Sequence, residues 1–549
     1  MEEIVFLPNY GKVKCGKVTR ANHPRAKKVS NFIEIPFAQP PIGKLRFQPP
    51  KRALPWTGIL FNTKQTKIPP QTIPEANESD IYFSFCPLKR TFSRQNCSED
   101  CLYLNVFAPV TSSIAKLPVM VWFYGGSFQV GPRYFFDGTA LAGMNDVIVV
   151  VPHYRVNTFG FLCMGSDTPC KGNFGLHDQL EALKWVKENI EYFGGDKDNV
   201  TVFGESAGAI SIHMHMMSSL SESYFHKAIC FSGSATVAKV VMKDQSRAVK
   251  KFLEILKIKE TSPEKILKEL QSFSMKKLCE ADYKLRKARF GWYVTIDNEL
   301  MCDMPKNLLS EKRFQKIPLI IGCNSSEGGW LMNVEMPNYL EGLSKEDYQR
   351  RSAILLKWLN RSIDASKTDS IILRYYNQGN ESTAENDRLY YTRGLAGVMA
   401  DCNFNIGIIL AADGHADCGA TTYFYHMKHP PCYNHDREYG PEKAQKPSFI
   451  ETDHADDIIF TWGFPFLPDN VQDGFKFSRE EMELSLSMMT YFANFAKTGN
   501  PNKGVLQEFE WPTYNSQNRP HIVLDIPLSK DLDFGVERYN IYTNILPNL

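Results

Sequence analysis

A serine placed between two glycines is the feature of this sequence with the clearest chemistry. The segment Gly204-Glu205-Ser206-Ala207-Gly208 follows a β-branched and aromatic run at 200–203 and precedes the helix-forming residues 209–217. This order predicts a strand, a sharp turn and a helix. Glycine is favoured where such a turn brings the chain close to both elements, and the turn lifts Ser206 clear of the sheet. The Ser206 hydroxyl is then accessible to a base, and the N–H of Ala207 can face an oxyanion.

A nucleophilic serine needs a base within hydrogen-bond reach and a third group that orients the base. Nine histidines follow Ser206, and among them His454 lies in a polar turn, Asp453-His454-Ala455-Asp456-Asp457, ahead of an apolar segment. A loop position suits a base that must reach over a sheet. For the acid, Glu327 lies just past an apolar run at 318–323, at the edge where the active sites of such sheets gather. His213 and His215 are interpreted as packing or surface residues rather than metal ligands.

Predicted strands and helices, which must position these residues, alternate along the chain. The spacing of apolar residues predicts amphipathic helices over 175–193 and 479–497, and a charged helical insertion over 240–288. Short strand-like segments at 12–18 and 31–38 predict antiparallel hairpins at a sheet edge, and the segment 60–98 is predicted to be a long surface loop. Continuous apolar runs, typical of strands buried on both faces, occupy 119–124, 148–151, 228–232, 318–323 and 422–426. We therefore expect an α/β fold with a large, mostly parallel central sheet, helices on both faces, and one domain spanning 1–549.

Composition limits the partners and the compartment. The 549 residues carry a net charge of +2, which gives no electrostatic reason to expect nucleic acid or an anionic membrane as a partner. The first ten residues carry acids where a signal peptide carries positive charge, and no run approaches a membrane span. A cytoplasmic protein is therefore predicted, with export to the ER lumen or outside the cell as the alternative for a processed form. Thirteen cysteines leave at least one unpaired.

Several motifs in a fixed order show that the chain resembles the type-B carboxylesterases of the cholinesterase-like family, which have the α/β-hydrolase fold. These motifs are Glu99-Asp100-Cys101-Leu102-Tyr103-Leu104-Asn105, the block 193–208, Asn324-x-x-Glu327-Gly328 and His454-Ala455-Asp456-Asp457. The resemblance implies that Ser206 is the nucleophile, that His454 is the general base and then acid, and that Glu327 holds the imidazole. It also implies two buried ion pairs, Arg46 with Glu99 and Arg155 with Asp178, and no cofactor or metal.

By the same resemblance, the N–H groups of Gly126, Ser127 and Ala207 form the oxyanion hole. The family usually has three glycines where this chain has Gly125-Gly126-Ser127. The Ser127 side chain could shift the donor or narrow the acyl side, and losing one donor costs roughly 3 kcal/mol of barrier. We expect a lower esterase activity or a narrower range of acyl groups. The alternative is that serine at position 127 has no effect on the activity.

The resemblance also implies a substrate pocket lined by Phe128, Glu205, Ala288, Phe290 and Trp330. Ala288 and Phe290 fall where acetylcholinesterases carry two acyl-pocket phenylalanines, which implies room for acyl groups larger than acetyl, and Trp330 would wall the alcohol side. The alternative for each aromatic residue is plain core packing.

The loop at 88–94 has three cations and lacks the choline-binding tryptophan of cholinesterases, which disfavours a quaternary ammonium substrate. Cys86 and Cys101 resemble the family's first disulfide.

The leading hypothesis is a serine esterase that hydrolyses neutral carboxylic esters through an acyl-enzyme. The rival is a non-catalytic cholinesterase-like adhesion module, which the intact set Ser206, Glu327 and His454 disfavours. A small-molecule ester is the expected partner, and association into a homo-oligomer stays open.

Overall fold

A large twisted sheet organises the computed structural model, which describes residues 3–64, 66–71, 97–111, 116–131, 136–336, 338–359, 363–364, 367–377, 387–432, 447–468 and 476–548. The strand order is β16-β15-β14-β13-β10-β9-β7-β8-β6-β4-β3. Neighbours from β8 through β15 are parallel, whereas β3, β4, β6 and β16 pair antiparallel at the two edges. The strands are β3 (Lys17–Thr19), β4 (Val29–Pro36), β6 (Tyr103–Pro109), β7 (Leu117–Phe123), β8 (Ile148–Pro152), β9 (Gly195–Glu205), β10 (Lys227–Phe231), β13 (Leu319–Asn324), β14 (Thr422–Met427), β15 (His521–Leu524) and β16 (Ser529–Asp531).

Helices cover both faces of this sheet because alternate strand residues point to opposite sides. In β9, for example, Val202 packs in the cluster beneath α3 (Phe174–Asn189), α4 (Ala207–Met216) and α13 (Ile406–Asp417). The adjacent Phe203 packs in the other cluster, beneath α1 (Thr139–Asn145) and α15 (Arg479–Thr498). The fold class is thus the expected one, an α/β hydrolase.

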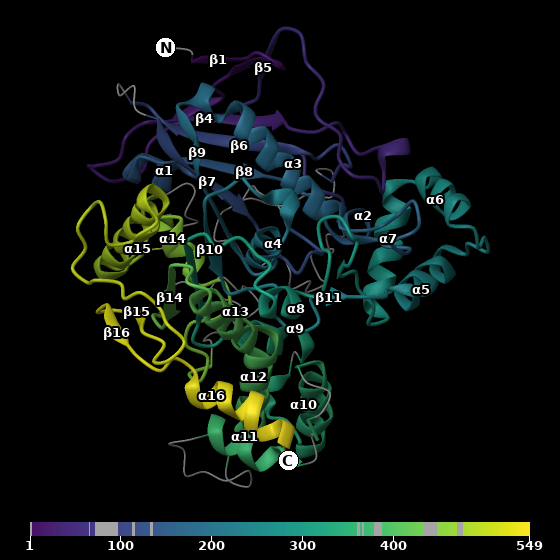
Figure 1. Ribbon diagram of the computed structural model, residues 1–549, viewed down its shortest axis with the longest axis vertical. Helices are drawn as coiled ribbons and strands as arrows, with labels where there is room; N and C mark the ends of the chain where they lie inside the picture. The colour runs from purple at the N-terminus through teal and green to yellow at the C-terminus, as the bar shows by residue number, and fades with distance from the viewer. Residues whose placement is uncertain are drawn as a thin grey trace.

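Further helices extend from the sheet at two places (Figure 1). The expected charged insertion forms a lobe of three helices at one side, and a second group, which includes the C-terminal helix, lies at the lower end. The first group is α5 (Ser246–Leu256), α6 (Pro263–Ser272) and α7 (Met275–Lys287). The second is α10 (Lys345–Leu359), α11 (Asp369–Tyr376), α12 (Tyr390–Ala400) and α16 (Val536–Asn540). The short helices α2 (Asn157–Phe161), α8 (Pro305–Ser310), α9 (Gly329–Glu335) and α14 (Asp457–Thr461) lie outside these two groups.

The segment 12–18 does not form the single strand that its sequence predicts. It divides into β2 (Gly11–Lys14), which belongs to a small sheet in the order β1-β2-β5, and β3 in the central sheet. The break falls at Gly16, where a Cβ would lie 2.0 Å from the carbonyl oxygen of Asn62. This close approach turns the chain from one sheet to the next. The other strands of the small sheet are β1 (Ile4–Leu7) and β5 (Ile59–Phe61).

Both predicted ion pairs are present: Arg155 with Asp178 is buried, and Arg46 with Glu99 is partly buried. Arg155 binds Asp178 through two contacts of 2.8 and 2.7 Å, and Arg46 binds Glu99 through two contacts of 2.6 Å. A long apolar helical stretch, Tyr390–Asp417, has the length and composition of a membrane span, but 78% of its apolar window is buried inside the protein. Its packing is that of a core helix.

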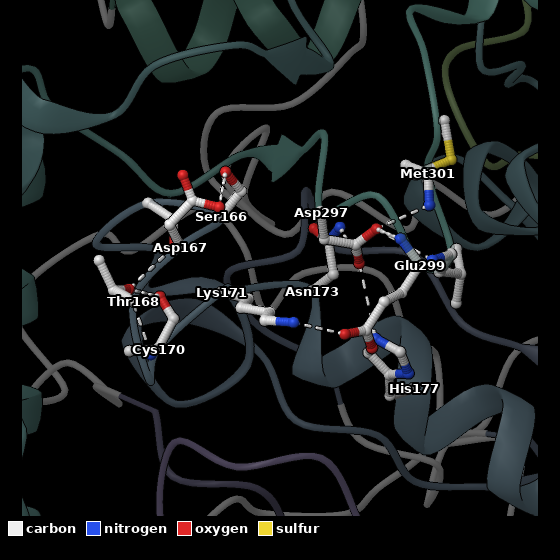
Figure 2. A network of polar contacts seen from close by, with 12 residues as sticks. Ser166, Asp167, Thr168, Cys170, Lys171, Asn173, His177, Asp297, Glu299 and Met301 are labelled. Carbon is white, nitrogen blue, oxygen red and sulfur yellow. Dashed lines mark hydrogen bonds and ion pairs between the residues drawn. The ribbon is translucent and has the colours of Figure 1, made fainter.

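A polar network around Asp297 fixes the start of α3 (Figure 2). One carboxylate oxygen accepts backbone hydrogen bonds from Glu299, Leu300 and Met301 at 2.9 to 3.0 Å. The other accepts from the Asn173 amide at 2.8 Å and lies 3.5 Å from His177 Nε2. Burial raises the pKa of Asp297, but these donors lower it more, so the net pKa lies below its ordinary value.

Replacing Asp297 with asparagine is expected to lower the free energy of unfolding at neutral pH by about 1–3 kcal/mol, because an amide group would oppose buried donors. A carboxylate whose pKa is depressed by folding stabilises the protein above its unfolded pKa, and this stabilisation is lost as pH falls through the folded pKa. The gap between wild type and Asp297→Asn, measured by urea unfolding, should therefore close on acidification. Asp167→Asn, at an exposed carboxylate of the same region, is the control and should shift stability by less than about 0.5 kcal/mol.

Candidate functional site

Ser206 lies at the turn between β9 and α4, as the sequence predicts. Its backbone has φ 53° and ψ −122°, a conformation that non-glycine residues rarely adopt, and its N–H donates to the carbonyl of Phe231 at 2.9 Å. A Cβ at Gly204 would lie 2.5 Å from the carbonyl oxygen of Phe123, and a Cβ at Gly208 only 1.9 Å from the same atom. Both glycines are therefore required for the turn to pass close to β7.

His454 and Glu327 meet at the same edge of the sheet. His454 Nδ1 lies 2.5 Å from Glu327 Oε2, and the Glu327 side chain is fully buried. The other carboxylate oxygen accepts hydrogen bonds from Ser232 Oγ and from the Asn324 N–H, both at 2.6 Å. With Nδ1 directed at the carboxylate, Nε2 is the imidazole atom that faces away from Glu327 and is the one available to act as a base.

The loops that supply acid and base are tied to each other. Ser326 N–H donates to the Thr452 carbonyl at 2.9 Å, and the Asn324 amide donates to the Asp453 carbonyl at 2.7 Å. Because both bonds join the residues that immediately precede Glu327 to those that immediately precede His454, they hold the two loops together without help from a substrate.

Glu205 is a second carboxylate at the imidazole. Its Oε1 lies 3.0 Å from His454 Nε2. Burial alone lowers the pKa of His454, but the charges of Glu205 and Glu327 outweigh burial, so the net pKa is raised well above the ordinary value. Burial also raises the pKa of the neighbouring Asp457 to about 7, although the Tyr425 hydroxyl that donates to it at 2.7 Å opposes this rise. The two carboxylates at the imidazole therefore raise its affinity for a proton.

Glu205→Gln is expected to move the acid limb of the kcat/KM profile to lower pH. A base with a raised pKa is protonated, and hence inactive, until the pH exceeds that pKa, so the wild-type profile should rise at higher pH than an ordinary histidine would give. Removing the Glu205 charge lowers the His454 pKa. Rates measured from pH 5 to 10 would contradict this assignment if wild type and Glu205→Gln share one acid limb, and Glu205→Asp, which keeps the charge, is the control.

The oxyanion segment runs beside the nucleophile. A Cβ at Gly125 would lie 2.4 Å from Glu205 Oε2 and 3.0 Å from Ser206 Cβ, so only glycine fits this approach. Gly126 has φ 111° and Ser127 has φ 55°, which places a serine in the left-handed region. Within the described part of the chain, no backbone carbonyl accepts from the N–H of Gly126 or Ser127. Ala207, the first residue of α4, has an N–H that helix geometry leaves without an intrahelical partner.

Aromatic side chains wall the imidazole. Trp330 stacks on His454 with ring centroids 5.3 Å apart, and Phe404 packs on it at 4.4 Å. Phe128 is buried against Phe161 at 4.9 Å. His454 is 1% exposed, so this arrangement keeps water away from the imidazole.

The predicted acyl-side residues lie at the end of α7. Ala288 is exposed, and Phe290 is half-buried against the cluster that includes Phe128. This segment reaches the oxyanion loop through the Gln129 amide, which donates to the Trp292 carbonyl at 3.1 Å. The roles of Ala288 and Phe290 in binding an acyl group stay predictions. Cys101 is fully buried, whereas Cys86 falls outside the described residues, so the predicted disulfide stays a prediction too.

Two residues at the site escape sequence reasoning. Ser232, which hydrogen-bonds Glu327, directly follows β10, the neighbour of the strand that carries the acid, and a polar residue at that strand end is a usable signal. Phe404 belongs to a π-helical turn, Asp401–Asn405, between α12 and α13. One extra residue in a helix leaves no distinct sequence pattern, so nothing predicts its contact with His454.

A strained serine after a parallel strand, with a glutamate and a histidine brought to the same sheet edge by later loops, defines a serine hydrolase of the α/β-hydrolase class. The chain belongs to the carboxylesterase family, because residues 2–541 match the family described as "Carboxylesterase family". It is therefore a carboxylic ester hydrolase.

Relatives span nearly the whole chain. Carboxylesterase 5A of the dog is 36% identical over 532 residues, which are 94% of this chain and 85% of that protein. Human carboxylesterase 5A is 34% identical with the same coverage, and mouse carboxylesterase 1F is 32% identical over 90% of this chain and 85% of its own length.

Proposed function

We propose that the protein hydrolyses neutral carboxylic esters through an acyl-enzyme formed on Ser206. The observation that carries the proposal is the 2.5 Å contact between His454 Nδ1 and buried Glu327, at the sheet edge where the strained Ser206 turn lies. The same elements support the roles of base, orienting acid and nucleophile that the sequence predicts.

In the first half-reaction, Ser206 Oγ attacks the ester carbonyl carbon while His454 Nε2 takes the hydroxyl proton. The N–H groups of Gly126, Ser127 and Ala207 stabilise the oxyanion of the tetrahedral intermediate. Collapse expels the alcohol, to which His454 returns the proton. Water then attacks the acyl-enzyme by the same steps, which releases the carboxylic acid and restores Ser206.

A neutral substrate suits the charges of this site. Glu205 and Glu327 both lie against the imidazole, so an ester with its own carboxylate near the reacting carbonyl would be repelled. The aromatic walls Trp330 and Phe404 instead favour apolar groups. A cytoplasmic location, with the ER lumen or export as the alternative, stays a prediction from the sequence, and association into a homo-oligomer stays open.

Turnover of p-nitrophenyl acetate, butyrate and octanoate, combined with titration by a fluorescent organophosphate, tests the proposal. We expect hydrolysis of all three esters, about one labelled site per chain, and the label on the peptide that contains Ser206. Binding of esters without turnover or labelling would favour the rival, a non-catalytic binding module.

Ser127→Gly is expected to raise kcat by up to about tenfold. Glycine clears the acyl side of the oxyanion hole, which is the reason for the higher kcat. It also relieves the roughly 1–2 kcal/mol that the left-handed backbone costs a residue with a Cβ, which raises stability. Comparison of kcat on acetate and octanoate esters measures the change. If kcat is unchanged on both, serine is simply tolerated there. Ser127→Ala, which keeps the Cβ, is the matched control.

A further inference from the structure

The small N-terminal sheet has one face built into the protein and one face turned to solvent. Its strands β1 and β5 lie at the periphery, at the opposite end of the molecule from the C-terminal helices (Figure 1). On the inner face Val5, Leu7 and Val13 are at most 7% exposed and join the main core cluster. This packing fixes the sheet as a rigid platform.

The outer face of this sheet is apolar along both of its edge strands, β1 and β5. Its β1 and β5 positions are all large hydrophobic residues, and their exposed fractions are 45% for Ile4, 58% for Phe6, 49% for Ile59 and 49% for Phe61. The outward face of a sheet that packs on only one side is ordinarily polar. Four large apolar side chains exposed on one face therefore mark a candidate binding surface.

Two lysines run between these apolar side chains. The strand pairing places Lys12 and Lys14 of β2 directly between their neighbours, in the cross-strand rows Phe6–Lys12–Ile59 and Ile4–Lys14–Phe61. Lys14 Nζ lies 4.8 Å from the centre of the Phe61 ring, so its aliphatic stem follows the apolar surface. The three strands contribute two cations to this face.

We propose that this outer face, formed by Ile4, Phe6, Lys12, Lys14, Ile59 and Phe61, docks on the surface of an anionic lipid bilayer. The apolar side chains would enter the boundary between headgroups and acyl chains, and the lysines would meet lipid phosphates and carboxylates. The binding is peripheral and does not require the chain to span the bilayer.

Charge distinguishes a bilayer from a second copy of the chain. A two-fold pairing through this face would set the central strand against its own copy, with lysine opposite lysine, and like charges oppose such contact. An anionic surface instead complements the lysines at the centre while it receives the apolar side chains on both sides. Docking would also concentrate the enzyme where apolar esters partition, although the binding itself does not depend on turnover.

Co-sedimentation of the full chain with vesicles tests the proposal. We expect binding to phosphatidylcholine vesicles that contain phosphatidylserine, and weaker binding to phosphatidylcholine alone or at high salt. Lys12→Gln with Lys14→Gln should lower the partition constant roughly 25-fold, at about fivefold for each lysine. Phe6→Asp with Phe61→Asp should abolish sedimentation.

Leu506→Asp is the matched control, because Leu506 is 88% exposed and lies in the loop after α15 rather than on this sheet; its binding should equal that of the wild type. Turnover of a soluble ester reports that each variant is folded. The proposal is overturned if the wild type does not sediment with anionic vesicles, if phosphatidylserine makes no difference, or if the sheet variants bind as the wild type does. A dimer that Phe6→Asp with Phe61→Asp dissociates, without vesicle binding, would assign the face to a second copy.

Discussion

Ser206→Ala is expected to lower kcat for p-nitrophenyl esters by about 10⁵- to 10⁶-fold, the scale seen when a serine hydrolase loses its nucleophile. The remaining turnover would come from substrate binding and the oxyanion donors alone. Alanine keeps the Cβ that the turn already accommodates at φ 53°, so the loss would reflect chemistry rather than unfolding. Initial rates together with loss of the organophosphate label measure the effect.

Ser211→Ala is the matched control for this loss. Ser211 is fully buried in the helix that follows Ser206, and its hydroxyl donates to the carbonyl of Ala207 at 2.7 Å and accepts from the Gln179 amide at 3.2 Å. Its replacement should cost about 1 kcal/mol of stability and leave kcat within severalfold of wild type. Substantial turnover by Ser206→Ala, with labelling at another residue, would assign the nucleophile elsewhere.

Much of the site was predictable because its signals are local. The glycines around Ser206 mark a turn where an added Cβ would lie within 2.5 Å of the Phe123 carbonyl oxygen of β7. The apolar runs before Glu327 and Ser206 mark strands whose ends meet at one edge. Parallel pairing from β8 through β15 then follows from the alternation of strands and helices.

The electrostatics of the site were not predictable from these signals. The contact between Glu205 and His454 Nε2 depends on how two loops and the turn pack together, and it reverses the expected effect of burial on the His454 pKa. Likewise, the break at Gly16 reflects a tertiary contact with Asn62, which no property of the segment 12–18 reveals. Local patterns specify elements, whereas distances between loops arise from the whole fold.

Glu327→Gln is expected to lower kcat by about 10⁴-fold, because an amide in place of the carboxylate selects the wrong imidazole tautomer. In the wild type one carboxylate oxygen accepts from Ser232 Oγ and from the Asn324 N–H. The backbone N–H can only donate, so the glutamine oxygen must take that position, and the NH₂ group then faces His454 Nδ1. The imidazole must accept there and carry its proton on Nε2, where it cannot receive the proton of Ser206.

The tautomer argument separates Glu327→Gln from a general loss of packing. Glutamine matches the volume of glutamate, so the variant should keep its fold and bind substrate with a KM near that of the wild type, while kcat falls. Glu327→Asp keeps the charge but shortens the side chain, and it should retain more activity than Glu327→Gln because the Nδ1 proton still meets an acceptor. If the Glu327→Gln variant proved nearly as active as the wild type, the imidazole would be oriented by Glu205 instead, since that carboxylate lies 3.0 Å from the opposite ring nitrogen.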